Sequence, residues 1–92
     1  MSDTSLPEST AALALDLRGL KCPLPALRTA RRLDAVPVGT VLEVATTDPM
    51  AAIDIPHLVQ TRGDRLLGTR AEGAVRVFSI EKVASRHADH ST

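Results

Sequence analysis

The chain has 92 residues, an apolar share of 43% and a single aromatic residue, Phe78, and its eleven basic residues balance eleven acidic ones. This length is that of one small domain. A zero net charge argues against bulk electrostatic binding to nucleic acid or to an anionic membrane, and the lack of aromatic residues argues against base stacking on single strands. A lone cysteine, Cys22, excludes an internal disulfide and is typical of a reducing, cytoplasmic setting.

Both ends of the chain are polar, and we interpret residues 1–11 and 84–92 as flexible tails around a domain of residues 12–83. The first residues lack the basic start and apolar run of a signal peptide, and no stretch is long and apolar enough to span a membrane.

The first half of the domain reads as strand, helix, strand. Leucines alternate along Ala12–Arg18, as in a half-buried strand. The segment Leu24–Leu33 places Leu24, Leu27, Ala30 and Leu33 along one helical stripe, with arginines on the other side. A turn at Pro37 and Gly39 precedes a second strand over Val41–Ala45.

The second half reads as helix, strand, strand. Asp48 and Pro49 suggest a cap and a short turn, and because Pro56 fits poorly inside a helix, we expect the second helix to start with Asp54 as its cap and to run to about Arg62. Two strands, Leu66–Ala71 and Ala74–Val83, follow, joined as a hairpin at Glu72-Gly73. The order β-α-β-α-β-β predicts an α/β two-layer sandwich: a four-stranded mixed sheet with two helices on one face.

Cys22 is the main candidate for chemistry. It follows the turn at Gly19 and precedes a predicted helix, and Pro23 pushes it toward the extended geometry of an N-cap residue. The helix dipole and the nearby Arg18 and Lys21 would then lower the pKa of the thiol modestly, while Pro23 and Pro25 hold it rigidly. The alternative from the residues alone is a buried cysteine that acts only as a small apolar side chain.

The run Asp16-Leu17-Arg18-Gly19-Leu20-Lys21-Cys22-Pro23-Leu24-Pro25 resembles the signature of the TusA (SirA-like) family of sulfur carriers, with its Cys-Pro-x-Pro motif. Thr47-Asp48-Pro49 and Asp54-Ile55-Pro56 fit the same pattern, so the similarity spans Leu15 to about Val83. One departure is Gly63-Asp64, where the family often has Gly-His, which puts any role of that histidine in partner choice in doubt.

The resemblance implies the β-α-β-α-β-β sandwich and a sulfurtransferase in the sense of a persulfide relay. Cys22 would accept sulfur from a cysteine desulfurase or rhodanese-type donor and pass it to an acceptor protein, without a cofactor of its own. Destinations include tRNA thiolation, with tRNA contacted through a partner, molybdoenzyme maturation and sulfur metabolism. We expect partners to bind at Arg18, Lys21, Leu24 and Arg28, and Gly19, Pro23 and Pro25 to shape the site.

The alternative is a non-catalytic regulatory or interaction module that binds protein or RNA through its basic helix face. The region contains five cations, Arg18, Lys21, Arg28, Arg31 and Arg32, and one anion, Asp16.

The remaining polar residues have simpler interpretations. We interpret Asp48 and Asp54 as helix caps rather than an acid–base pair, and Asp16 as solvent-facing. We interpret His87 and His90 as part of a solvated tail rather than a metal site. A Cys–His pair would have to use His57.

Overall fold

The computed structural model describes residues 12–83, so the predicted tails, with His87 and His90, lie outside the described residues. Six elements follow one another in the predicted order. They are β1 (Ala12–Leu17), α1 (Leu24–Ala35), β2 (Val41–Thr46), α2 (Ala51–Arg62), β3 (Arg65–Glu72) and β4 (Val75–Glu81).

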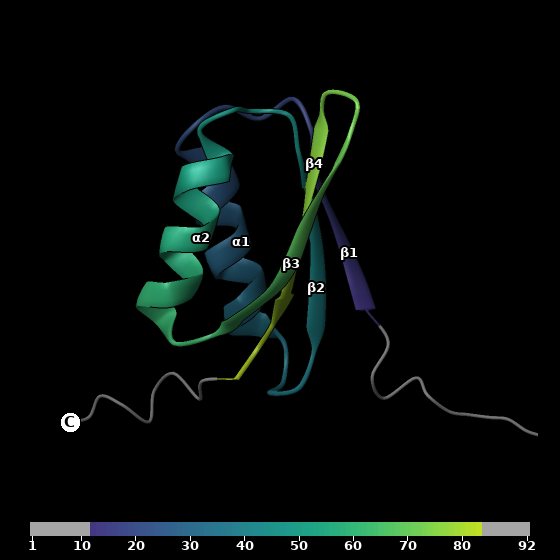
Figure 1. The fold of residues 1–92 in the computed structure, drawn as a ribbon. Helices are drawn as coiled ribbons and strands as arrows, with labels where there is room; N and C mark the ends of the chain where they lie inside the picture. Colours follow the sequence, from purple (N-terminus) through teal and green to yellow (C-terminus); the bar gives the residue numbers. More distant parts are fainter. Residues whose placement is uncertain (1–11, 84–92) are drawn as a thin grey trace, which may run out of the picture.

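The four strands form one mixed sheet in the order β1-β2-β4-β3. β1 runs parallel to β2, while β4 pairs antiparallel with both β2 and β3. Both helices lie on the same face of the sheet, and they begin at the end where β1 and β2 finish (Figure 1). The predicted two-layer α/β sandwich is confirmed.

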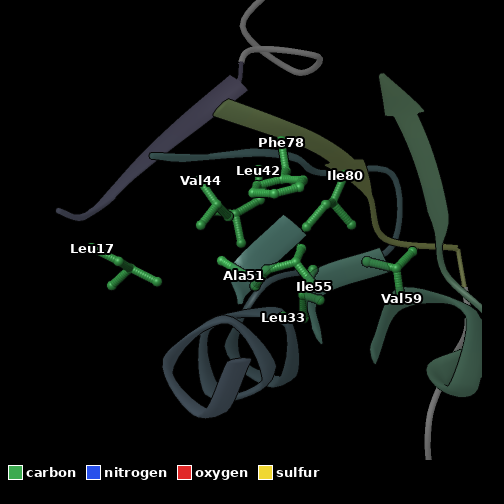
Figure 2. Packing of buried hydrophobic residues seen from close by; sticks show 9 residues of the cluster. All are labelled: Leu17, Leu33, Leu42, Val44, Ala51, Ile55, Val59, Phe78 and Ile80. Carbon is green, nitrogen blue, oxygen red and sulfur yellow. The ribbon is translucent and has the colours of Figure 1, made fainter. Parts of the chain in front are cut away.

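The core lies between the sheet and the two helices. Alternate residues of β2 and β4 face the helices, because side chains along a strand point to opposite sides in turn. Figure 2 shows the nine buried residues that meet there, contributed by β1, both helices and the two central strands: Leu17, Leu33, Leu42, Val44, Ala51, Ile55, Val59, Phe78 and Ile80.

The predicted start of the second helix is wrong. α2 begins at Ala51, so Asp54 lies in its first turn instead of capping it, and Pro56 is inside the helix. A proline removes one helical hydrogen bond. The helix continues through Pro56 because Ile55 and Val59, on either side of it, are buried against the sheet.

The predicted apolar stripe of α1 is also displaced. The face against the sheet carries Pro25, Thr29 and Leu33, whereas Leu24 and Leu27 are 40% and 55% exposed. Thr29 can be fully buried because its hydroxyl donates a hydrogen bond of 2.7 Å to the carbonyl of Pro25, one turn earlier.

The carbonyl groups at the C-terminal end of α1 accept hydrogen bonds from a residue that lies far away in the sequence. Pro37 has no N–H to offer the carbonyl of Leu33, four residues before it. The Lys82 ammonium, beyond the end of β4, donates instead to Leu33 O at 2.7 Å and to Val36 O at 2.9 Å. Lys82 is only 6% exposed, so its charge is stabilised by these carbonyls inside the protein.

Candidate functional site

Cys22 lies in the connection between β1 and α1, and it is exposed. This connection is at the end of the molecule where α2 also begins (Figure 1). The crossover from a parallel strand therefore brings the thiol beside the loop that links β2 to α2.

The turn before Cys22 depends on Gly19, whose φ of +87° lies in the left-handed region that favours glycine. Its N–H donates to Thr47 Oγ1 at 2.8 Å, and the N–H of Leu20 donates to Leu17 O at 3.2 Å. The turn is thus fixed to the residue that directly follows β2.

Asp48 joins the two loops. Its Oδ2 accepts a hydrogen bond from the backbone N–H of Cys22, and its Oδ1 accepts one from the N–H of Met50 at 3.1 Å. One carboxylate therefore positions the backbone at the thiol and orders the approach to α2. Asp48 does act near a helix start, as expected, but the N-cap position itself is Met50.

The side chain of Cys22 meets a second carboxylate. The thiol Sγ donates to Asp54 Oδ2 at 3.1 Å, from the first turn of α2. The interpretation of Asp54 as a cap is wrong, because its carboxylate points to the sulfur. These two residues are 32 positions apart, so no local pattern reveals the pair.

The expected lowering of the Cys22 pKa is wrong as well. The hydrogen bond to Asp54 raises the pKa of the thiol, and desolvation and the negative charges of Asp54 and Asp48 add to this shift. Arg18 does not compensate, because its guanidinium makes a two-point ion pair with Asp16, at 2.8 and 2.9 Å. Asp16 is exposed, as expected, and Arg18 lowers its pKa to about 2.

Cys22 is not the cap of α1. Pro23 occupies the N-cap position, and no side chain in residues 12–83 forms a hydrogen bond that caps this end. The first turn is instead closed by the backbone, with Leu24 N–H donating to Lys21 O at 2.8 Å and Leu27 N–H to Pro23 O at 3.1 Å. Pro25 is buried, so it fixes this turn to the core.

The four residues expected to bind partners do not form one cluster. Lys21 and Leu24 are exposed next to Cys22, and Arg18 is exposed but paired. Arg28 lies with Arg31 and Arg32 along a separate hollow of about 470 Å³, whose other walls are Leu15 of β1 and Ala35.

A second hollow, of about 320 Å³, lies between the two helices beside the thiol. Asp54 forms part of its wall, and the other lining residues are Pro23, Ala26, His57, Leu58 and Thr61. His57 therefore shares this groove with Asp54, but the carboxylate, and not the imidazole, is the side-chain partner of Cys22.

The family model described as Sulfurtransferase TusA matches residues 13–82, which is most of the chain. The chain belongs to this family. The match covers all six elements of the sandwich apart from the first residue of β1, along with the Cys22 loop and both carboxylates that contact it.

Relatives of this TusA-family chain include a "Sulfur carrier protein TusA" of Allochromatium vinosum, 40% identical over 68 residues, which are 74% of this chain and 90% of that protein. Another is a "Putative sulfur carrier protein YrkF" of Bacillus subtilis, 30% identical over 82 residues, or 89% of this chain but only 44% of the relative. A "Sulfur carrier protein TusA" of Pseudomonas entomophila is 36% identical over 70 residues, 76% of this chain and 88% of that protein.

The departure from the family pattern at Gly63-Asp64 has a structural account here. Gly63 ends α2 with a φ of +84°. The Asp64 side chain is fully buried, and it accepts hydrogen bonds of 3.0 Å from Arg62 Nε and from the backbone N–H of Val83. Since Arg62 also contacts Asp34 at 3.0 Å, this position connects the ends of both helices to the chain after β4.

Within residues 12–83, no three histidine, cysteine, aspartate or glutamate side chains are grouped so that they could hold a metal ion. No helix in the same range is long and apolar enough to cross a membrane.

Proposed function

We propose that this TusA-family protein is a sulfur carrier that bears its cargo as a persulfide on Cys22. The observation that carries the proposal is an exposed lone cysteine in a backbone setting fixed by Thr47 and Asp48. A carrier must present its sulfur to the active site of another protein, and an exposed loop at one end of a small body suits this task. The relatives named sulfur carrier proteins support the same function.

The donor we propose is a cysteine desulfurase or a rhodanese-type protein, and the acceptor is a second protein that consumes the sulfur, in tRNA thiolation, molybdoenzyme maturation or sulfur metabolism. We place this work in the cytoplasm, where an exposed thiol stays reduced. Docking of a protein at this end is supported by exposed apolar side chains around the site. These are Leu24 beside Cys22, together with Met50 and Ile53 at the start of α2.

The test is intact mass spectrometry after incubation with a desulfurase and free cysteine. We expect wild-type protein to gain one sulfur atom, which dithiothreitol removes, and we expect Cys22→Ser to gain none. Transfer from the loaded protein to an acceptor then measures the second half of the relay. If several persulfide donors of both types fail to load the wild type, the carrier proposal is wrong.

A further inference from the structure

The hydrogen bond between Cys22 and Asp54 depends on the protonation of the thiol. At neutral pH a carboxylate can only accept hydrogen bonds, so the proton in the 3.1 Å contact between Sγ and Oδ2 must come from Cys22. A thiolate at the same place would lose this bond and would face the carboxylate as a like charge. The arrangement favours the protonated, unreactive form.

The other charged groups around the sulfur do not reverse this preference. Asp48 adds a second negative charge from the loop before α2, and Arg18 is occupied by Asp16. Lys21 precedes Cys22 in the chain, and His57 lies in the same groove as Asp54 on α2. With all of them in place, the pKa of Cys22 is still raised.

We propose that Asp54 is a positioning residue that holds the proton on the resting Cys22 thiol, so that sulfur acceptance waits for a donor that breaks the Cys22–Asp54 hydrogen bond. This inference deepens the proposed function and rests on it. The donor would break this hydrogen bond by bringing a cation to the sulfur or by changing the position of the Cys22 loop against α2.

Sulfur passes from the donor to Cys22 by exchange between a thiolate and a persulfide. Once its proton has left, the Cys22 thiolate attacks the outer sulfur of the donor persulfide. A new S–S bond forms on Cys22, the S–S bond of the donor breaks, and its inner sulfur leaves as a thiolate with the electron pair. The proton from Cys22 passes to that donor thiolate, and the sulfane sulfur moves without a net change of oxidation state.

The same geometry distinguishes the loaded protein from the empty one. A persulfide places its outer sulfur about 2 Å beyond Sγ. Sγ of a persulfide carries no proton, so it cannot donate to Asp54. When the ionised outer sulfur points away from Asp54, its charge is farther from the carboxylate, and Coulomb repulsion weakens with distance. Asp54 suppresses ionisation of the empty carrier more than that of the loaded one, so the cargo stays available for attack on an acceptor.

The test is the pH profile of Cys22 alkylation by iodoacetamide, which can modify only one cysteine in this chain. We expect the wild-type midpoint to lie above the ordinary thiol value of about 8.5 and Asp54→Asn to lower it. For each unit of that fall, the alkylation rate at pH 7 should rise about 3-fold, since a tenfold gain in thiolate is partly offset by its weaker nucleophilicity.

Glu81→Gln is the matched control. It removes one negative charge at the opposite end of the sheet, where Glu81 pairs with the first residue of β2, and it should leave the midpoint unchanged. A second arm compares loading by inorganic polysulfide with loading by a desulfurase. Asp54→Asn should raise the polysulfide rate severalfold and the desulfurase rate less, because the protein donor already breaks the hydrogen bond.

A wild-type midpoint at or below 8.5 overturns the proposal, and so does an unchanged or higher midpoint in Asp54→Asn. If Asp54→Asn raises the loading rates by polysulfide and by the desulfurase equally, docking of the protein donor does not break the Cys22–Asp54 hydrogen bond, and that part of the proposal is wrong. Because alkylation needs no sulfur donor, its outcome is independent of whether Cys22 carries persulfide. If Asp54→Asn does not fold, the pH profile of the wild-type protein still tests whether the pKa of Cys22 is raised.

Discussion

At the scale of single residues, the site is defined by two carboxylates with different partners. Asp48 binds the backbone of Cys22, and Asp54 binds its sulfur. The first determines where the thiol lies, and the second determines whether it keeps its proton. A lone cysteine in a glycine turn could be singled out from the sequence, but the sign of its pKa shift could not, because both carboxylates come from beyond β2 and are placed there by the fold.

We expect Asp48→Ala to lower the free energy of unfolding by about 1 kcal/mol, since the N–H groups of Cys22 and Met50 lose their side-chain acceptor. It should also slow sulfur loading, because the loop at the thiol is no longer joined to the start of α2. Urea unfolding and loading by a desulfurase measure the two effects.

Asp48→Asn is the matched control, because its amide oxygen can still accept one of the two bonds and should restore part of the stability. An alanine variant as stable and as quickly loaded as the wild type would show that this carboxylate does not position Cys22.

At the scale of elements, the sequence predicted the order of strands and helices correctly but mistook which face of α1 is buried. The helical periodicity of apolar residues was the basis of the prediction, so Leu24 and Leu27, and not Thr29, were expected on the buried face. A threonine can be buried at a helix–sheet contact when its hydroxyl bonds to its own helix, as here to Pro25. Both leucines remain exposed, and Leu24 follows Cys22 closely in the chain, where it is available to a partner.

The closure of α1 by Lys82 was not foreseen either, because it depends on a residue 49 positions away from Leu33. We expect Lys82→Met to reduce the free energy of unfolding by about 1–3 kcal/mol, since it leaves two carbonyl groups without their donor. Urea unfolding measures this.

The comparison variant for Lys82 is the arginine substitution, which retains charge and donors and should be less harmful if it can reach the same carbonyls. A methionine variant with wild-type stability would mean that water satisfies these carbonyls as well as Lys82 does.

At the scale of the whole molecule, we propose residues 12–83 as the folding unit, in agreement with the family match over residues 13–82. Residues 12–83 contain ten basic and eight acidic residues, a net charge of +2. This charge is unevenly distributed, because the Cys22 loop and α1 carry most of the unpaired arginine and lysine side chains named above. A donor or acceptor with an acidic surface would be attracted to this side.

We expect Lys21→Glu and Arg28→Glu each to slow loading by a desulfurase and to weaken its dependence on salt, with unfolding free energies changed by no more than about 0.5 kcal/mol. Arg65→Glu is the control for charge, because Arg65 is 66% exposed on the sheet face away from the helices. Loading rates measured from low to high salt test this.

Equal slowing by all three variants would indicate a general effect of net charge. Unchanged rates in Lys21→Glu and Arg28→Glu would remove these two residues from the docking surface.

The sheet order has a consequence for how the chain is made. β4 comes last in the chain among the four strands of this sheet, yet it lies between β2 and β3 and supplies Phe78 and Ile80 to the core. Until it emerges, β1 and β2 cannot be joined to β3, and Lys82 cannot close α1. Synthesis runs from the N-terminus, so the four-stranded sheet can be completed only after β4 has emerged from the ribosome. β4 also pairs with β2 as far as Thr46, directly before the loop that carries Thr47 and Asp48. A product truncated before β4 should therefore lack both the core and the support for this loop, and we expect it to present no ordered sulfur site to its partners.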